Sequence, residues 1–242
     1  MPSVQDHYDN LLAEHYTWMF GVPFEQKVIE QTELLQAMGV ASPATAIDLG
    51  CGSGFQSFAL VELGARAVLS IDTSQQLLDE LTSHRSAEPI QVECADLTTF
   101  PSLIDGPVDT IVCMGDTLTH LPNRVTLSKL FKDMAHALKR GGQLVLSYRD
   151  LSTMPSGLDR FIPLRSTKDK IMTCFVEKIG HSVMVHDLVY VRENDDWVLH
   201  KGAYPKLILP EPEIKAELDR RGFSLYAERD VRGMVILGLK RR

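Results

Sequence analysis

The sequence predicts an α/β protein built on one doubly wound, mainly parallel sheet. Short apolar runs alternate with amphipathic segments between residues 45 and 148, which is the pattern of successive β-α units. Three alternating glycines follow the first of these apolar runs. The chain ends in two apolar runs joined by a short connection, and such a connection permits only an antiparallel pair.

The first forty residues are expected to form a helical cap, residues 1–40. An aromatic-rich segment from His7 to Phe20 comes first, and a helix from Phe24 to Met38 follows it. Gly39 is expected to end this helix, because glycine readily takes the left-handed conformation found at helix C-termini.

Strands and helices are then expected to alternate, which requires a mainly parallel sheet. The strands are expected at 45–49, 67–71, 90–93, 108–114 and 143–148, and the helices at 55–63, 74–83 and 124–139. Asn123 is expected to cap the last of these helices with its side-chain oxygen. Residues 139–142, Lys-Arg-Gly-Gly, are expected to end it. Cations are favourable at the negative end of the helix dipole, and glycine is favoured just after the last helical residue.

Between Asp150 and Pro210 the alternation stops. Three β-like runs appear at 171–178, 183–192 and 197–206, separated by turn residues. We expect an inserted antiparallel meander, residues 151–210, that leaves the sheet at the end of the fifth strand and covers the active site. Alternatively, the meander would form a dimerisation surface, giving a homo-oligomer, or would simply pack against the rest of the domain.

After the meander, a helix at 212–221 and strands at 224–229 and 234–239 complete the chain. The predicted fold is therefore a Rossmann-like, doubly wound seven-stranded sheet with an antiparallel last strand and an inserted β meander. At 242 residues, 1–242 is expected to be a single domain.

Composition and charge narrow the class of function. A net charge of −7, with one basic run at residues 240–242, argues against a nucleic-acid partner. The four cysteines have neither metal-site spacing nor disulfide density, so we expect no metal and a cytoplasmic location. Because no apolar run approaches membrane-spanning length, no membrane association is expected.

Residues 46–54 read Ala-Ile-Asp-Leu-Gly-Cys-Gly-Ser-Gly and are the strongest functional signal. Glycines permit positive φ and keep Cβ atoms away from a ligand, while the following helix directs its N-terminus at that ligand. Phe55 stands where a dinucleotide-binding motif needs a small residue. The pattern from Asp48 to Gly54 instead resembles the first motif of class I S-adenosylmethionine-dependent methyltransferases.

Two further acids follow the next two strands. Asp72 stands where doubly wound folds place a ribose-binding acid, and is expected to accept from both ribose hydroxyls. Asp96 can accept from the adenine amino group, and Leu97 can cover the ring. The cofactor is therefore expected to be S-adenosylmethionine, with S-adenosylhomocysteine as product. Its expected site comprises Tyr16, Asp48, Gly50, Cys51, Gly52, Asp72, Thr73, Leu77, Asp96, Leu97 and Met114.

Residues 108–122 read Val-Asp-Thr-Ile-Val-Cys-Met-Gly-Asp-Thr-Leu-Thr-His-Leu-Pro. They resemble the fourth strand and following loop of the glycine N-methyltransferase family, where the loop reads Gly-Asn-Ser-x-x-His-Leu-Pro. Residues 148–150, Tyr-Arg-Asp, stand where that family has His-Arg-Asn. Lys168 to Ile171, Tyr204-Pro205 and the N-terminal Tyr8 are similar to family positions as well.

The resemblance implies a catalytic set of Tyr8, Asp116, His120, Arg149 and Tyr204. In that family the arginine pairs with the carboxylate of the methyl acceptor, the role expected of Arg149. Tyr8 would direct its hydroxyl toward the methyl group, Tyr16 would flank the cofactor, and His120 would orient Tyr8 or the acceptor. Each residue also has a structural alternative. Arg149 would hold a loop or helix in place, Tyr8 would cover the core, and His120 would form a local hydrogen bond.

Two departures from the family bear on the acceptor. Asp116 replaces an asparagine, and an anion there would favour a cationic amine. Residues 160–165 replace a tyrosine-lined stretch. We therefore expect N-methylation of a small amine or amino-acid-like acceptor. The alternatives are an O-methyltransferase with His181, His186 and His200 shaping the pocket, and an S-adenosylmethionine-binding protein without turnover.

Overall fold

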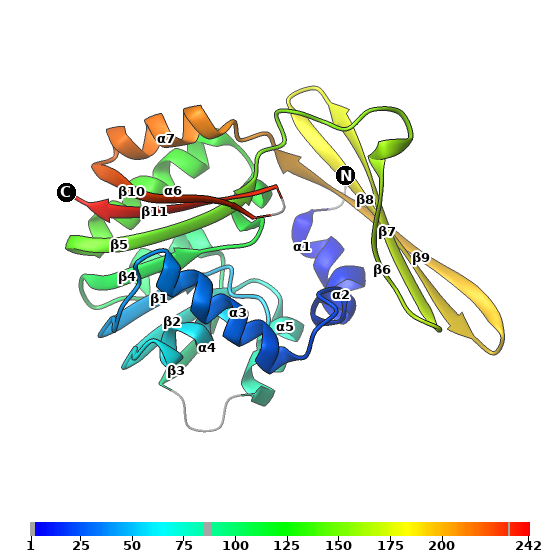
Figure 1. Cartoon of the computed structure of the whole chain (residues 1–242), viewed down its shortest axis with the longest axis horizontal. Coiled ribbons are helices and arrows are strands. Elements are labelled where there is room, and N and C mark those ends of the chain that lie inside the picture. The colour runs from blue at the N-terminus through cyan, green and yellow to red at the C-terminus, as the bar shows by residue number, and fades with distance from the viewer. Residues whose placement is uncertain (1–2, 85–88, 232) are drawn as a thin grey trace.

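The computed structural model describes residues 3–84, 89–231 and 233–242. A seven-stranded sheet with helices on both faces forms one layer system, and a separate four-stranded sheet stands beside it (Figure 1). The first helices of the chain lie between the two sheets.

The larger sheet has the order β10-β11-β5-β4-β1-β2-β3. Its strands are β1 Thr45–Leu49, β2 Ala67–Asp72, β3 Ile90–Cys94, β4 Val108–Cys113, β5 Leu138–Arg149, β10 Phe223–Val231 and β11 Met234–Arg241. Strands β1 to β5 pair in parallel, whereas β11 is antiparallel to both β5 and β10. The predicted fold class is confirmed. Because the order reverses between β1 and β4, the carboxyl ends of these strands frame the ligand crevice.

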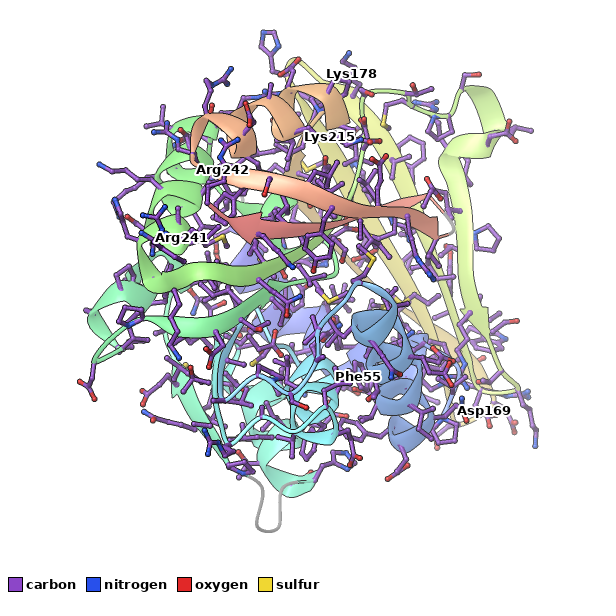
Figure 2. The ribbon with its side chains drawn as sticks, turned by 60° about the vertical axis from the view of Figure 1, so that its left-hand side comes forward. Phe55, Asp169, Lys178, Lys215, Arg241 and Arg242 are labelled. Atoms are coloured by element: carbon purple, nitrogen blue, oxygen red, sulfur yellow. The ribbon has the colours of Figure 1, made fainter. Side chains whose placement is uncertain are left out.

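Helices cover both faces of this sheet. They are α3 Phe24–Ala37, α4 Phe55–Glu62 and α5 Gln75–His84 on one face, and α6 Arg124–Ala137 and α7 Glu211–Arg220 on the other. Successive strand residues serve the two cores alternately, since Ile111 packs with α6 and Val112 with α4. Phe55 marks the start of α4 in Figure 2 and packs on Phe24.

The main difference from the predicted elements of this sheet lies where α6 meets β5. Helix α6 ends at Ala137, and β5 already begins at Leu138, so Lys139 to Gly142 belongs to the strand. Gly141 has φ 75°, and the register with β4 shifts at this point. The glycine therefore produces an irregularity within a strand rather than a helix exit. The predicted cap is confirmed, because Asn123 accepts from the Thr126 N–H at 2.9 Å.

The smaller sheet is a four-stranded antiparallel meander. Its strands are β6 Phe161–Ser166, β7 Lys170–Ile179, β8 Ser182–Glu193 and β9 Asp196–Leu207. The sequence predicted β7, β8 and β9, whereas β6 was missed. Strand β6 is an edge strand that contains Pro163, and such a strand has no alternating apolar pattern to reveal it.

The N-terminal segment, residues 3–19, is broken into short turns. It comprises α1 Val4–His7, the π-helical turn η1 Tyr8–Leu12, the 3₁₀ turn η2 Ala13–His15 and α2 Tyr16–Met19. Leu11 and Leu12 pack against Met172 and Val189 of the meander. Arg165 donates to the Trp18 carbonyl and lies over its ring. Within the described ranges, no helix is long and apolar enough to cross a membrane.

Candidate cofactor and acceptor site

The loop between β1 and α4 is shaped by its three glycines. Gly50, Gly52 and Gly54 have φ values of 73°, 53° and 95°, which other residues rarely adopt. A Cβ atom at Gly50 would lie 2.4 Å from Cγ2 of Thr117. A Cβ atom at Gly52 would lie 3.2 Å from the Tyr16 ring. The backbone thus approaches its neighbours more closely than a side chain would allow.

Asp72 ends β2 and binds this loop. Its Oδ2 accepts from the Gly52 N–H at 2.8 Å, and its Oδ1 accepts from the Ser74 N–H at 3.0 Å. Burial raises the pKa of this carboxyl group, although the N–H groups oppose that effect. Each carboxylate oxygen has a second lone pair, so Asp72 can also accept from the hydroxyls of a ribose.

Asp48 lies in β1 beneath the loop and is only 1% exposed. Its Oδ2 accepts from the Ser57 hydroxyl at 2.7 Å, and Ser57 in turn accepts from Ser70 at 2.7 Å. Burial raises the pKa of Asp48 to about 7, since the ordered hydroxyl only partly offsets the loss of water. A cation beside this loop would favour its ionised form.

The remaining predicted cofactor residues surround the same strand ends. Asp96 caps the 3₁₀ turn η3 Leu97–Ser102, accepting from the Thr98 N–H at 2.7 Å. Thr73 is exposed, Leu97 is half-buried, and Cys51, Leu77 and Met114 are buried. Parallel pairing aligns β1, β2 and β3, so the three acids line one edge of the sheet. This glycine loop and acidic edge fit a nucleoside-containing cofactor.

Four predicted aromatic side chains form a continuous row from the glycine loop to the meander. The ring centroids of Tyr8 lie 6.3 Å from Tyr16 and 5.8 Å from His120, and His120 lies 5.5 Å from Tyr204. Burial raises the pKa of all three tyrosines, so each hydroxyl keeps its proton. The row therefore presents uncharged aromatic surface and hydroxyl groups.

Asp116 follows β4 and already has a cationic partner. Its Oδ2 accepts from the Lys206 ammonium at 2.7 Å, and its Oδ1 accepts from the Arg149 N–H at 3.0 Å. Burial alone would raise its pKa, but the charge and hydrogen bond of Lys206, together with the Arg149 N–H, outweigh burial and the pKa falls to about 2. The expectation that this carboxylate attracts a cationic acceptor needs correction, because its charge is balanced within the protein.

Arg149 and His120 flank this ion pair. Arg149 ends β5, its side chain is 48% exposed, and its Nε lies 3.6 Å from Asp116. His120 ends the 3₁₀ turn η4 Thr117–His120. Burial, followed by the charge of Lys206, lowers the pKa of His120 to about 3, so its ring is neutral. Its Nε2 is buried and has no hydrogen-bond partner among the described residues.

The glycine loop lies in the part of the chain that is similar to a known protein family. Residues 46–142 match the model of a methyltransferase domain. These residues are thus similar to a methyltransferase domain. The fold of the chain is also that of the CcbJ methyltransferase from Streptomyces caelestis, with a TM-score of 0.77 at 15% identity and 98% coverage of each chain.

Curated relatives of this chain include several N-methyltransferases. The cypemycin N-terminal methyltransferase of a Streptomyces species is 31% identical over 52% of this chain and 55% of its own length. Human glycine N-methyltransferase is 30% identical over 65% of this chain and 55% of its own length. The matches thus span about half of each relative. Other relatives of similar identity are ubiquinone biosynthesis O-methyltransferases.

Sequence reasoning missed several side chains beside the aromatic row. Lys206 is two residues after Tyr204 in β9, and the period of a strand places both on one face. His7 and Asp187 form a buried pair, with Nε2 2.8 Å from Oδ2. Asp187 interrupts an alternating apolar face of β8, which was the available signal. A Cβ atom at Gly202 would lie 2.5 Å from the His7 ring.

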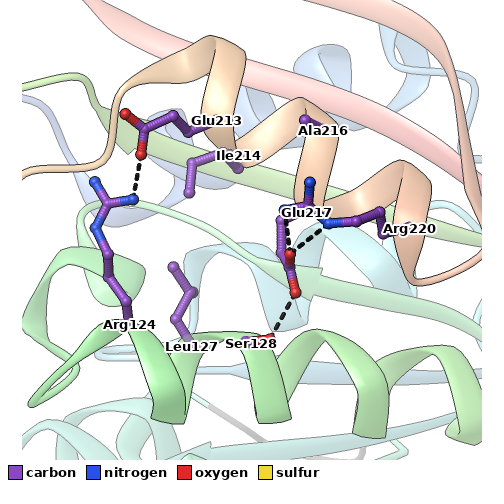
Figure 3. Close-up of a pocket in the computed structure, with 8 residues that line it drawn as sticks. All are labelled: Arg124, Leu127, Ser128, Glu213, Ile214, Ala216, Glu217 and Arg220. Carbon is purple, nitrogen blue, oxygen red and sulfur yellow. Dashed lines mark hydrogen bonds and ion pairs between the residues drawn. The ribbon is translucent and has the colours of Figure 1, made fainter.

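A separate groove lies between α6 and α7 and encloses about 290 Å³ (Figure 3). Its polar side chains are tied to one another: Arg124 binds Glu213, and Glu217 accepts from Ser128 at 2.6 Å. None of the predicted site residues lines it. Its charged groups therefore serve to join two helices.

Proposed function

We propose that this protein is an S-adenosylmethionine-dependent N-methyltransferase acting on a small-molecule amine, with an amino-acid-like compound as the preferred class. The observation that carries the proposal is the neutral His120, held between Tyr8 and Tyr204 with a buried Nε2 that lacks a hydrogen-bond partner among the residues that the structure describes. Two N-methyltransferases among the curated relatives support it.

The cofactor would bind across the carboxyl ends of β1, β2 and β3. Asp72 would accept from the ribose hydroxyls, Asp96 from the adenine amino group, and Leu97 would cover the ring. The glycine loop would receive the methionine portion, where the ionised form of Asp48 suits a cationic group. When bound, the cofactor supplies an electrophilic methyl group on a sulfonium sulfur.

The acceptor side must present a nitrogen lone pair in line with that methyl group. Neutral His120 can accept a hydrogen bond from an amine N–H through Nε2, which would orient the lone pair. Tyr8 and Tyr16 would exclude water above the glycine loop. Arg149 would bind the carboxylate of an amino-acid-like acceptor, since a guanidinium offers several donors in fixed geometry.

In this proposal, residues 1–40 cap the cofactor and residues 151–210 cover the acceptor pocket. The contacts of the N-terminal segment support the arrangement. Tyr16 lies against Gly52, and the Thr17 hydroxyl donates to Ser53 at 3.1 Å. On its other side the segment packs on the meander through Leu11 and Leu12.

The test is a turnover assay with methyl-labelled S-adenosylmethionine. Purified protein is incubated with amino acids, short peptides, amino sugars, carboxylic acids and phenols, and S-adenosylhomocysteine is measured. Amine-dependent product is the expected result. Product with only carboxylic acids or hydroxyl compounds would replace the proposal with O-methylation, and tight cofactor binding without product would indicate a binding protein.

A further inference from the structure

Lys206 is a buried cation on the inner face of the meander. The residue is 8% exposed, and its Nζ donates to Asp116 Oδ2 at 2.7 Å. It also lies over the Tyr204 ring, 5.7 Å from the centroid. An ammonium group is rarely buried without a function or a partner. Here it has a partner, and it stands beside the proposed acceptor position.

The charged and titratable groups around Lys206 come from seven parts of the fold. Asp116 and His120 follow β4, Arg149 ends β5, Tyr8 opens η1, Tyr204 lies in β9, Cys174 lies in β7, and the His7–Asp187 pair joins α1 to β8. Lys206 lowers the pKa of His120 more strongly than Asp116 raises it. At His120, therefore, the effect of Lys206 exceeds that of its own counter-ion.

We propose that Lys206 sets the charge of the acceptor pocket, so that the acceptor amine binds as the neutral base rather than as the ammonium ion. This inference rests on the proposed N-methyltransferase function. Only the neutral amine has the lone pair that attacks the methyl group, and the proton of the new ammonium product is released afterwards. A fixed cation close to the nitrogen disfavours its protonated form.

The charge reaches the acceptor through the same groups that shape the pocket. His120, whose Nε2 would accept from the amine, lies between Tyr204 and Tyr8, and Lys206 contacts the Tyr204 ring. Asp116 carries the opposite charge but is engaged at both oxygens. Lys206 is thus a positioning and specificity-determining residue, since it acts on the acceptor's protonation without providing the nucleophile.

The experiment compares Lys206→Met with Asp116→Asn, because the two substitutions remove opposite charges from one ion pair. The kcat of methyl transfer is measured against pH with glycine, triglycine and any other amine that the wild-type protein methylates. Lys206→Met should move the alkaline rise of kcat about one pH unit upward, lowering kcat near pH 7 roughly tenfold without raising the amine KM. Asp116→Asn should move the rise downward.

Lys206→Arg keeps the charge and should restore most of the wild-type profile. A second readout needs no acceptor: in ¹H–¹⁵N spectra, the His120 ring should titrate at higher pH in Lys206→Met than in the wild type. Near-ultraviolet circular dichroism checks that each variant is folded.

The outcomes separate this inference from the proposed function. Opposite movements of the two profiles support the charge role. A higher KM with an unmoved profile in both variants would overturn it and leave a structural ion pair. If no amine is methylated by the wild-type protein, the N-methyltransferase proposal fails, and an unmoved His120 titration would then overturn the charge role as well.

Discussion

At the scale of single residues, the three acids at the strand ends have different surroundings and therefore different properties. Asp116 has a buried cationic partner and a pKa of about 2. Asp48 accepts from the Ser57 hydroxyl and backbone N–H, and has a pKa of about 7. Asp72 is held by two backbone N–H groups. Residue type alone does not separate these three carboxylates, because burial and partners determine what each can do.

Replacing Asp72 with alanine should weaken S-adenosylmethionine binding roughly 10- to 150-fold, because charge-assisted hydrogen bonds contribute about 1.5–3 kcal/mol. Isothermal titration calorimetry measures the change in Kd. Asp105→Ala provides the control, since Asp105 is an exposed loop carboxylate. Equal affinity in the two variants would remove Asp72 from the ribose site.

Asp48 should make cofactor binding depend on pH near neutrality. Its folded-state pKa of about 7 exceeds its ordinary value of 3.8, so the protonated form is favoured in the folded protein. Stability should therefore fall as pH rises from about 4 to about 7. A bound cationic group would favour the carboxylate, so binding should release a proton near pH 6.5.

Calorimetry in buffers of different ionisation enthalpy measures the number of protons released when S-adenosylmethionine binds. Asp48→Asn should abolish the release and the associated rise of affinity between about pH 6 and pH 8. Proton release that persists in the variant would assign it to another group.

At the scale of elements, the loop between β1 and α4 was predictable because its function depends on backbone shape. Gly50 needs both a positive φ and the absence of a Cβ atom, given Thr117 on its other side. The sequence indicated the first requirement. It could not indicate the second, because the contact joins segments 67 residues apart that meet only when β1 and β4 pair.

Gly50→Ala should therefore lose more stability than backbone strain alone would cost. Gly180 has a similar φ of 60°, but apart from its two chain neighbours no described residue has an atom within 4 Å of its Cβ position, so Gly180→Ala isolates the strain, about 1–2 kcal/mol. The excess loss of stability and of cofactor affinity in Gly50→Ala measures the close approach. Thermal unfolding and calorimetry provide both values, and matching losses in the two variants would contradict the packing argument.

At the scale of the whole molecule, the sequence predicted the sheet and the meander but not how they meet. Periodicity and glycines identified the larger sheet, because each β-α unit is a local pattern. The meander's contacts are long-range: Lys206 meets Asp116 across 90 residues, and Asp187 meets His7 across 180. Such pairs leave no local signal beyond a charged residue on an otherwise apolar strand face, which is why these side chains were missed.

The His7–Asp187 pair predicts that the N-terminal segment and the meander are energetically coupled. His7 also packs on Tyr204, with ring centroids 4.4 Å apart, and precedes Tyr8 directly. His7→Ala leaves the buried Asp187 carboxylate without this partner, so stability should fall by about 1–3 kcal/mol. Because the same segment carries Tyr16 over Gly52, S-adenosylmethionine should also dissociate faster. His136→Ala, on the exposed side of α6, is the matched control. Hydrogen exchange of residues 4–19 and stopped-flow dissociation test the coupling; loosening of the segment with an unchanged dissociation rate would show that it does not retain the cofactor.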